Sequence, residues 1–170
     1  MREGIDQLLT RYENGGISRR ELLGTLAALL AVAPAAKAAE PAIGTVKQVN
    51  HVTIFVQDVQ KSVDFYQGLF GMPVLTMQPP GVNLRAGASF LGVYPAGTQA
   101  TGINHICFGL DGFDADGVLK KLTDRGLKGA IRLRGDTKEL YFSDPDGIRI
   151  QLQDVSYRGG VGPLGDRDPK

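Results

Sequence analysis

The chain contains an internal repeat, and this repeat constrains the fold more than any other feature. Residues 49–55 (Val-Asn-His-Val-Thr-Ile-Phe) and 103–109 (Ile-Asn-His-Ile-Cys-Phe-Gly) read alike, 54 residues apart. Repetition at such a period indicates two copies of one supersecondary unit. Apolar and polar residues alternate along both segments, which predicts two β-strands with His51 and His105 on equivalent faces. We therefore expect two modules, at about residues 47–95 and 101–155.

Each first strand is followed by a predicted helix and three short extended runs. Asp58 precedes a helical stretch at residues 59–70, and Asp114 precedes one at residues 115–125. Turns rich in Gly, Pro and Asp separate the extended runs, which lie near 73–77, 82–86, 89–94, 131–134, 138–143 and 148–154. Two βαβββ modules predict an α+β fold, with a cup-shaped mixed sheet and helices on its outer face. The inside of the cup is the expected ligand site.

The composition excludes several classes of function. Lys and Arg together number 19 and Asp and Glu 18, so no strong field favours nucleic acid. The single cysteine excludes an intramolecular disulfide. Phosphate-loop and nucleophile-elbow motifs are missing, and no histidine outside the repeat is left for a serine-type triad. The expected partner is a small molecule.

Residues 1–38 have the three-part layout of an export signal. Arg19 and Arg20 precede an apolar run at residues 22–33, and small residues at 34–38 follow at cleavage spacing. The run is shorter than the roughly 20 residues of a membrane-spanning helix. Its start, Ser-Arg-Arg-Glu-Leu-Leu, resembles a twin-arginine signal. We expect a periplasmic or secreted protein without a stable membrane anchor after cleavage; the alternative is an amphipathic N-terminal helix.

The two histidines of the chain occupy the same position of the repeat. A lone strand histidine is usually a hydrogen-bonded core residue, but a twofold-related pair can converge on one point. We therefore predict that His51 and His105 bind a divalent metal ion. By strand alternation, the adjacent Asn50 and Asn104 are expected to face away from the histidines.

The third metal ligand is expected from the last strand of the second module. Alternation there turns Arg149, Gln151 and Gln153 into the cup, and Gln151 is the predicted donor. Two imidazoles and one oxygen suit Fe(II) or Mn(II), with Zn(II) or Ni(II) as further candidates. Arg149 and Gln153 are expected to bind substrate. For Arg149 the alternative is a rim salt bridge to Glu139 or Asp154.

Residues 140–151, Leu-Tyr-Phe-Ser-Asp-Pro-Asp-Gly-Ile-Arg-Ile-Gln, resemble the closing signature Y-x-x-D-P-x-G-x-x-x-E of the glyoxalase, bleomycin-resistance and dioxygenase superfamily. The resemblance, which covers about residues 47–155, implies a vicinal oxygen chelate domain, here residues 39–157. It implies an enzyme whose substrate chelates the metal through adjacent oxygens. It also implies a catalytic hydrogen-bonding or proton-donating role for Tyr141, and a possible homodimer.

Two departures from the superfamily pattern keep alternatives open. Gln151 replaces the usual glutamate, and residues 131–134 lack the acid/base histidine of ring-cleaving members. Isomerase or lyase chemistry therefore stays open beside a slight preference for a dioxygenase. The runner-up is a metal-free binding protein of the bleomycin-resistance type, and a structural module with relic histidines comes third. Residues 158–170, rich in Gly, Asp and Pro, are expected to form a flexible tail.

Overall fold

The computed structural model describes residues 2–31 and 41–168 and divides the chain into two compact units, with the boundary after Pro41. The first unit contains helices α1 (Arg2–Glu13) and α2 (Arg19–Ala31). Ser18 and Glu21 cap α2 reciprocally: the Ser18 backbone N–H donates to Glu21 Oε2 at 2.8 Å, and the Glu21 N–H donates to Ser18 Oγ at 3.3 Å. None of the helices in the described segments is long and apolar enough to cross a membrane. The expected cleavage region, residues 34–38, lies outside the described residues.

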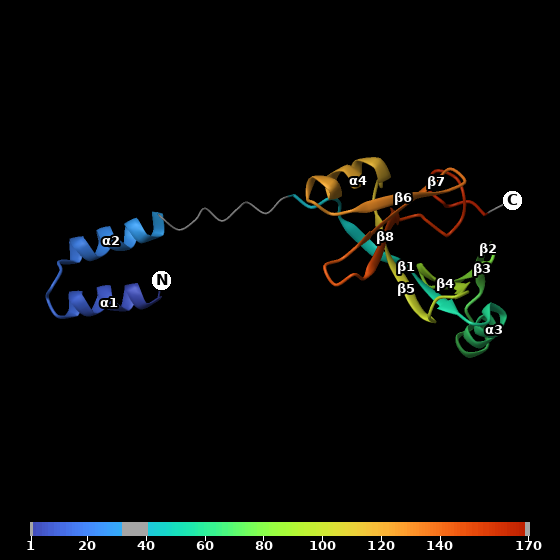
Figure 1. The fold of residues 1–170 in the computed structure, drawn as a ribbon, viewed down its shortest axis with the longest axis horizontal. Helices are drawn as coiled ribbons and strands as arrows, with labels where there is room; N and C mark the ends of the chain where they lie inside the picture. Colours follow the sequence, from blue (N-terminus) through green and yellow to red (C-terminus); the bar gives the residue numbers. More distant parts are fainter. Residues whose placement is uncertain (1, 32–40, 169–170) are drawn as a thin grey trace. The chain divides into compact units, whose positions relative to one another are not determined.

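The second unit contains one eight-stranded sheet and two helices (Figure 1). Its elements are, in chain order, β1 (Val46–Val56), α3 (Val59–Phe70), β2 (Val74–Gln78), β3 (Gly81–Ala86), β4 (Ser89–Pro95), β5 (Gly102–Leu110), α4 (Ala115–Asp124), β6 (Gly129–Arg134), β7 (Thr137–Ser143) and β8 (Arg149–Asp154). The strand order is β2-β3-β4-β1-β5-β8-β7-β6. This confirms the predicted α+β fold of two βαβββ modules, with small differences at the ends of elements.

The two modules join through antiparallel pairing of β1 with β5 at the centre of the sheet. In each module the last strand pairs in parallel with the first, β4 with β1 and β8 with β5. The registers are equivalent, because Thr53 lies opposite Gly92 as Cys107 lies opposite Gln151. The sequence repeat therefore corresponds to a structural repeat with a common register.

Each module packs its own helix against the convex face of the sheet. Val63 of α3 contacts a cluster with Leu84 and Val93, whereas Val118 and Leu122 of α4 pack against apolar residues of β5, β7 and β8. Burial of these apolar side chains away from water stabilises the outer layer. The alternate residues of the same strands are left to line the concave face.

Irregular pairing at the centre of the sheet changes the direction of two side chains. The β1–β5 ladder pairs Val49 with Phe108 and then His51 with Cys107, so Asn50 is skipped. Asn104 is skipped on β5 in the same way. A bulge re-aims the side chain of the extra residue. Asn50 and Asn104 accordingly reach the neighbouring histidines, contrary to the expectation from strict alternation.

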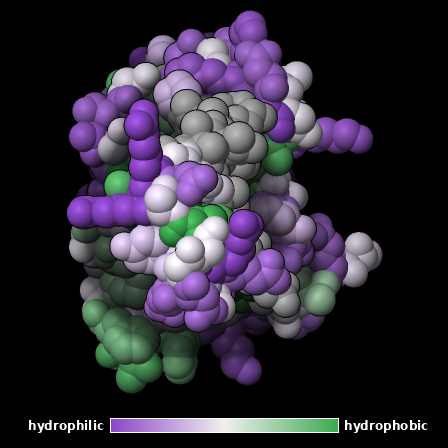
Figure 2. Space-filling view, turned by 90° about the vertical axis from the view of Figure 1, so that its left-hand side faces the viewer, coloured by the Kyte–Doolittle hydropathy of each residue, from purple (hydrophilic) through white to green (hydrophobic). Residues whose placement is uncertain are grey.

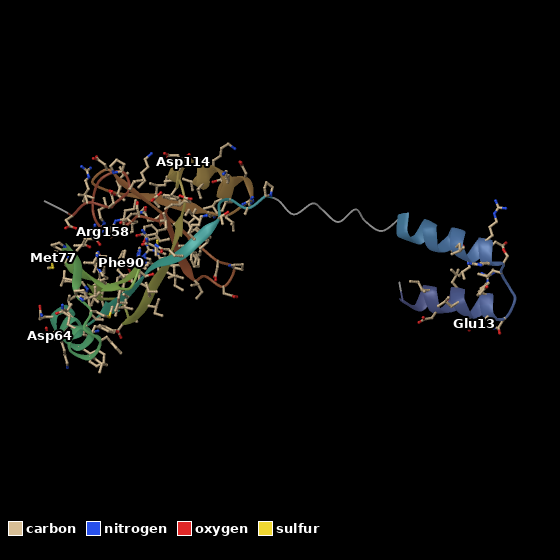
Figure 3. The ribbon with its side chains drawn as sticks, turned by 180° about the vertical axis from the view of Figure 1, so that it is seen from behind. Glu13, Asp64, Met77, Phe90, Asp114 and Arg158 are labelled. Atoms are coloured by element: carbon tan, nitrogen blue, oxygen red, sulfur yellow. The ribbon has the colours of Figure 1, made fainter. Side chains whose placement is uncertain are left out.

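The C-terminal segment docks against the domain as far as Gly165, which differs from the expected flexible tail at residues 158–170. Thr76 Oγ donates to the Arg158 carbonyl at 2.9 Å, and Arg158 lies beside the β2 edge of the sheet (Figure 3). Thr137 Oγ donates to the carbonyl of Gly162. Gly159, with φ of 75°, lies directly against the Asn83 side chain, where a Cβ would collide. Glycine here permits close packing, whereas its frequency in the sequence suggested disorder.

The outer surface of α3 is apolar in part. Phe65, Leu69 and Phe70 are exposed, and Figure 2 shows a hydrophobic patch at the bottom of the molecule, the level of α3 in Figure 1. The end strands of the sheet, β2 and β6, each have one neighbour. The homodimer expected from the sequence stays a prediction.

Candidate metal centre and its pocket

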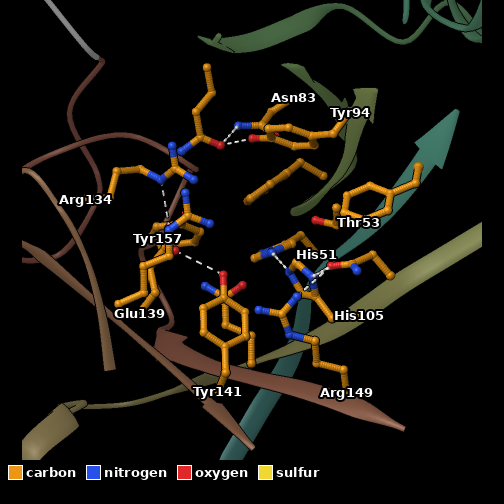
Figure 4. A pocket seen from close by; sticks show the side chains of 16 residues that line it. His51, Thr53, Asn83, Tyr94, His105, Arg134, Glu139, Tyr141, Arg149 and Tyr157 are labelled. Carbon is orange, nitrogen blue, oxygen red and sulfur yellow. Dashed lines mark hydrogen bonds and ion pairs between the residues drawn. The ribbon is translucent and has the colours of Figure 1, made fainter. Parts of the chain in front are cut away.

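A pocket opens on the concave face between the two modules (Figure 4). It contains about 470 Å³ of empty space, including its open mouth. Side chains from both modules and from the C-terminal segment line it: His51, Thr53, Phe55, Gln78, Asn83, Phe90, Tyr94, Asn104, His105, Arg132, Arg134, Glu139, Tyr141, Arg149, Gln151 and Tyr157. All of these side chains come from one chain.

The repeat brings the two histidines together inside this pocket. His51 Nε2 lies 3.2 Å from His105 Nε2, and the ring planes are inclined by 81°. Phe90 stacks on His51 with ring centroids 4.3 Å apart, and Tyr141 contacts His105 edge-on at 5.4 Å. Aromatic packing on both rings restricts their rotation, so the two Nε2 atoms stay directed at each other.

Hydrogen bonds from the adjacent asparagines fix which ring nitrogen carries the proton. His51 Nδ1 lies 2.9 Å from Asn50 Oδ1, and His105 Nδ1 lies 2.8 Å from Asn104 Oδ1. The Asn50 amide cannot be reversed, because its Nδ2 donates to the carbonyl of Tyr157 at 2.9 Å. Asn104 Oδ1 also accepts from Arg149 Nη1 at 3.2 Å. Both histidines therefore donate from Nδ1 and present a lone pair at Nε2.

Burial keeps both imidazoles neutral. It lowers the pKa of His51 well below its usual value, and the charge of His105 lowers it further. Burial, followed by the charge of Arg149, lowers the pKa of His105 to about 4. At neutral pH no proton is shared between the rings, and two lone pairs face each other. A divalent cation between the Nε2 atoms relieves this repulsion.

Gln151 supplies the third donor of the set. Its side chain is fully buried, and it lies close enough to both histidines to raise their pKa values against the effect of burial. By hydrogen-bond distance and angle, however, neither Oε1 nor Nε2 has a partner among the described residues. An unsatisfied buried polar group costs about 1–3 kcal/mol, which coordination of Oε1 would offset. Two nitrogens about 2.1 Å from one ion lie about 3.0–3.4 Å apart, in agreement with the observed 3.2 Å. The donors fit a divalent ion.

The proposed metal site depends on the Gln151 amide as its third ligand. Across residues 2–31 and 41–168, no group of three or more His, Cys, Asp and Glu side chains is placed to hold a metal ion. His51, His105 and Gln151 together carry no formal charge, so they bind a cation less tightly than a set that includes a carboxylate. A divalent ion held by these three residues would keep its full positive charge, which an anionic ligand could balance.

The first module supplies no ligand equivalent to Gln151. Gly92 occupies the position of β4 that Gln151 occupies in β8, since the two registers are equivalent. A Cβ at Gly92 would lie 2.9 Å from Thr53 Oγ1, 3.0 Å from Tyr94 Cε2 and 3.2 Å from Asn83 Oδ1. The side chains of Thr53, Tyr94 and Asn83 therefore close around this glycine, and β4 contributes no donor beside the histidines.

Glu139 is a buried carboxylate at the centre of a hydrogen-bond cluster that the sequence analysis missed. Tyr157 Oη donates to Glu139 Oε1 at 3.0 Å, and Tyr141 Oη donates to Oε2 at 3.0 Å. Arg134 Nε donates to Oε1 at 2.9 Å. Burial and then the charge of Glu139 raise the pKa of both tyrosines, so their protons stay on the hydroxyls. Glu139 precedes Tyr141 by two residues on β7, and strand alternation is the signal that would have placed it inside the cup.

The two predicted substrate-binding residues lie in different places, one inside the pocket and one outside it. Arg149 lines the pocket, with its guanidinium 4.3 Å above the Tyr141 ring, and the alternative ion pairs with Glu139 and Asp154 do not form. Gln153 is buried outside the pocket, where its Nε2 donates to the Lys138 carbonyl at 3.1 Å.

Comparisons with known proteins agree with this architecture. Residues 48–152 match the family model described as Glyoxalase/Bleomycin resistance protein/Dioxygenase superfamily. The metallothiol transferase FosB of Lysinibacillus sphaericus is 28% identical over 116 residues, which cover 64% of this chain and 82% of that protein. The FosB protein of Bacillus licheniformis is 31% identical over 116 residues, which cover 61% of this chain and 73% of that protein.

Solved structures share the fold at low sequence identity. Methylmalonyl-CoA epimerase of Streptomyces coelicolor superposes with a TM-score of 0.53 at 21% identity, covering 64% of this chain and 94% of that chain. The 2,3-dioxygenase LapB of Pseudomonas sp. KL28 gives 0.57 at 19% identity, covering 66% of this chain and 42% of that chain. One architecture thus carries different chemistries.

Proposed function

Because the chain belongs to the Glyoxalase/Bleomycin resistance protein/Dioxygenase superfamily, we propose that it is a metal-dependent enzyme acting on a small anionic substrate with two adjacent oxygens. The single observation that carries this proposal is the pair of facing Nε2 lone pairs, 3.2 Å apart, beside the unpartnered amide of Gln151. His51, His105 and Gln151 would hold the ion. When bound, the ion would supply Lewis-acid stabilisation of negative charge on the substrate.

The residues around the proposed ion support proton transfer as the chemistry. Arg132, Arg134 and Arg149 line the pocket with one carboxylate, Glu139, so the charge of the lining favours an anion. Tyr141 Oη holds its proton toward Glu139 Oε2. Glu139 is placed to accept a proton, and Tyr141 Oη to donate one to a substrate oxygen. Glu139 would then act as the base and Tyr141 as the acid.

A hydrogen-exchange experiment tests this proposal. 2-Oxopentanoate offers adjacent carboxylate and keto oxygens and an acidic proton on the next carbon. With Mn(II)-loaded protein in D₂O, we expect exchange of that proton, measured by NMR after removal of the metal. Tyr141→Phe should slow the exchange about 100-fold, a typical contribution of a positioned proton donor, and leave metal affinity unchanged.

Tyr66→Phe is the matched control, because Tyr66 belongs to α3 and packs against the apolar cluster of the first module, away from the pocket lining. It should exchange at the wild-type rate. Exchange no faster than with free Mn(II), for 2-oxo acids of several chain lengths, would contradict a proton-transfer function.

Dioxygenase chemistry is the second candidate. Two histidines and one oxygen donor can leave positions of an Fe(II) ion free for substrate and dioxygen, and His51, His105 and Gln151 all line one pocket. Oxygen consumption by the Fe(II)-loaded protein with catechol, in the absence of proton exchange with 2-oxo acids, would favour this function.

We also propose that residues 1–38 direct export by the twin-arginine route. Arg19 and Arg20 are exposed at the first turn of α2, next to the Ser18–Glu21 cap, where a recognition factor can reach them. In a bacterium with this route, we expect the mature protein to begin after Ala38 and to reach the periplasm. Paired Arg19→Lys and Arg20→Lys changes keep the charge and should block processing, measured by cell fractionation and N-terminal sequencing.

Arg11→Lys is the control for this experiment, since Arg11 lies upstream of the motif, in α1. Normal processing of the double lysine variant would argue against the twin-arginine assignment.

A further inference from the structure

A second group of polar side chains lines the pocket on the side of the first module. Asn83 Nδ2 donates to Thr76 Oγ1 at 2.8 Å and to Gln78 Oε1 at 3.4 Å. Tyr94 Oη also donates to Gln78 Oε1. Figure 4 shows the Asn83–Tyr94 pair across the cavity from Tyr141 and Arg149. We call Thr76, Gln78, Asn83 and Tyr94 the amide cluster.

These bonds fix the orientation of the Gln78 amide. Because its oxygen accepts from both Asn83 and Tyr94, its nitrogen must point away from them. Gln78 is 5% exposed and lines the pocket, and its Nε2 has no hydrogen-bond partner among the described residues. A buried N–H₂ group without an acceptor is unfavourable by about 1–3 kcal/mol. An acceptor oxygen on a ligand would satisfy it.

The amide cluster borders the space that a ligand at the histidines can enter. Gln78, Asn83 and Tyr94 line the same pocket as the two histidines. Asn83 lies opposite Gly92 in the β3–β4 ladder, where Thr53, Tyr94 and Asn83 close around the glycine. Burial raises the pKa of Tyr94 to about 12, the charges of Arg134 and Arg132 lower it, and the charge of Glu139 raises it. Arg134 is paired with Glu139, so the two arginines leave a net positive charge within electrostatic range of the amide cluster.

We propose that the amide cluster is a second binding subsite, in which Gln78 Nε2 donates to a carboxylate on the end of the substrate remote from the metal. The substrate is then a bifunctional anion, with adjacent chelating oxygens at one end and a carboxylate at the other. Arg134 contributes favourable charge, and Gln78 provides the directional contact. The identity of the chelating end rests on the proposed function, whereas the subsite itself does not.

Two matched ligands test the subsite on the metal-loaded protein. 2-Oxopentanedioate and 2-oxopentanoate share the chelating end and differ in a terminal carboxylate or methyl group. By isothermal calorimetry we expect the dicarboxylate to bind about 10-fold more tightly, as one charge-assisted hydrogen bond provides. Analogues one carbon shorter and longer, each with its methyl-ended partner, locate the best reach. No gain from the terminal carboxylate at any length would overturn the proposal.

Gln78→Glu keeps the oxygen that accepts from Asn83 and Tyr94, replaces the donor with a second oxygen and adds a negative charge. It should abolish the advantage of the dicarboxylate, and 2-oxopentanedioate should lose more affinity than 2-oxopentanoate. Gln78→Met provides a second, uncharged test of the same loss. An advantage that survives in both variants would assign the carboxylate to another group.

A metal-free measurement separates this proposal from the proposed function. In ¹⁵N-labelled apoprotein, butanoate should shift the Gln78 side-chain N–H₂ resonances, identified by their disappearance in Gln78→Met. Butanol is the matched control and should leave them unchanged. A shift without any metal binding would support the subsite and refute the metal enzyme, whereas metal binding without a shift or a dicarboxylate gain would refute the subsite alone.

Discussion

Replacing His51 or His105 with alanine is expected to abolish stoichiometric metal binding. The wild-type chain should bind about one ion, because its three donors converge from β1, β5 and β8. Loss of an outer partner of a metal ligand typically weakens affinity 10–100-fold, so loss of a ligand itself should exceed about 100-fold. Anaerobic titration of residues 39–170 with Fe(II), Mn(II), Zn(II) and Ni(II), followed by metal analysis, measures the effect.

Asn104→Ala provides a graded control. It removes the acceptor that holds the His105 Nδ1 proton and should weaken binding by about 10–100-fold without abolishing it. Wild-type affinity in either histidine variant would refute the proposed ligand set. If the wild-type chain binds none of the four ions, the metal-free binding protein becomes the better interpretation.

Replacing Glu139 with alanine should destabilise the domain by about 3–5 kcal/mol, the usual cost of removing one partner of a buried ion pair. The side chain of Glu139 is 1% exposed and that of Arg134 is 23% exposed. The variant leaves this guanidinium unpaired and deprives the Tyr141 and Tyr157 hydroxyls of their acceptor. Urea unfolding of the metal-free protein measures the change, and Glu139→Gln should lose less because it keeps an acceptor oxygen.

The matched control is the exposed ion pair formed by Lys138, the residue before Glu139. Lys138 pairs with Asp116, but both side chains are largely exposed, so Asp116→Ala should change the free energy of unfolding by less than about 1 kcal/mol. If Glu139→Ala costs no more than Asp116→Ala, the Glu139 cluster does not stabilise the fold as its burial indicates.

The repeat and strand alternation predicted the architecture and the convergence of the candidate metal ligands in one pocket. Two similar segments with equivalent histidines require a twofold arrangement, and the register of β8 then places Gln151 beside them. Alternation failed at Asn50 and Asn104, because a bulge depends on pairing with a neighbouring strand and leaves no mark in a single sequence.

Other parts of the site depend on contacts between distant segments. Tyr157 reaches Glu139 only because the C-terminal segment folds back over the concave face. The glycines of this segment had suggested a flexible tail. The orientation of the Gln78 amide follows from its hydrogen bonds to Asn83 and Tyr94, which lie on two neighbouring strands. Tertiary packing of this kind cannot be derived from local pattern.

The docked C-terminal segment also affects the order in which the site can form. The Asn50 amide that orients His51 is held by the carbonyls of Val155 and Tyr157. Tyr157 follows Asn50 by 107 residues, so a chain synthesised only as far as β8 cannot hold His51 in its final orientation. A metal ion held by the proposed ligands would therefore be selected after this segment has docked, from the metals of the compartment where the domain folds.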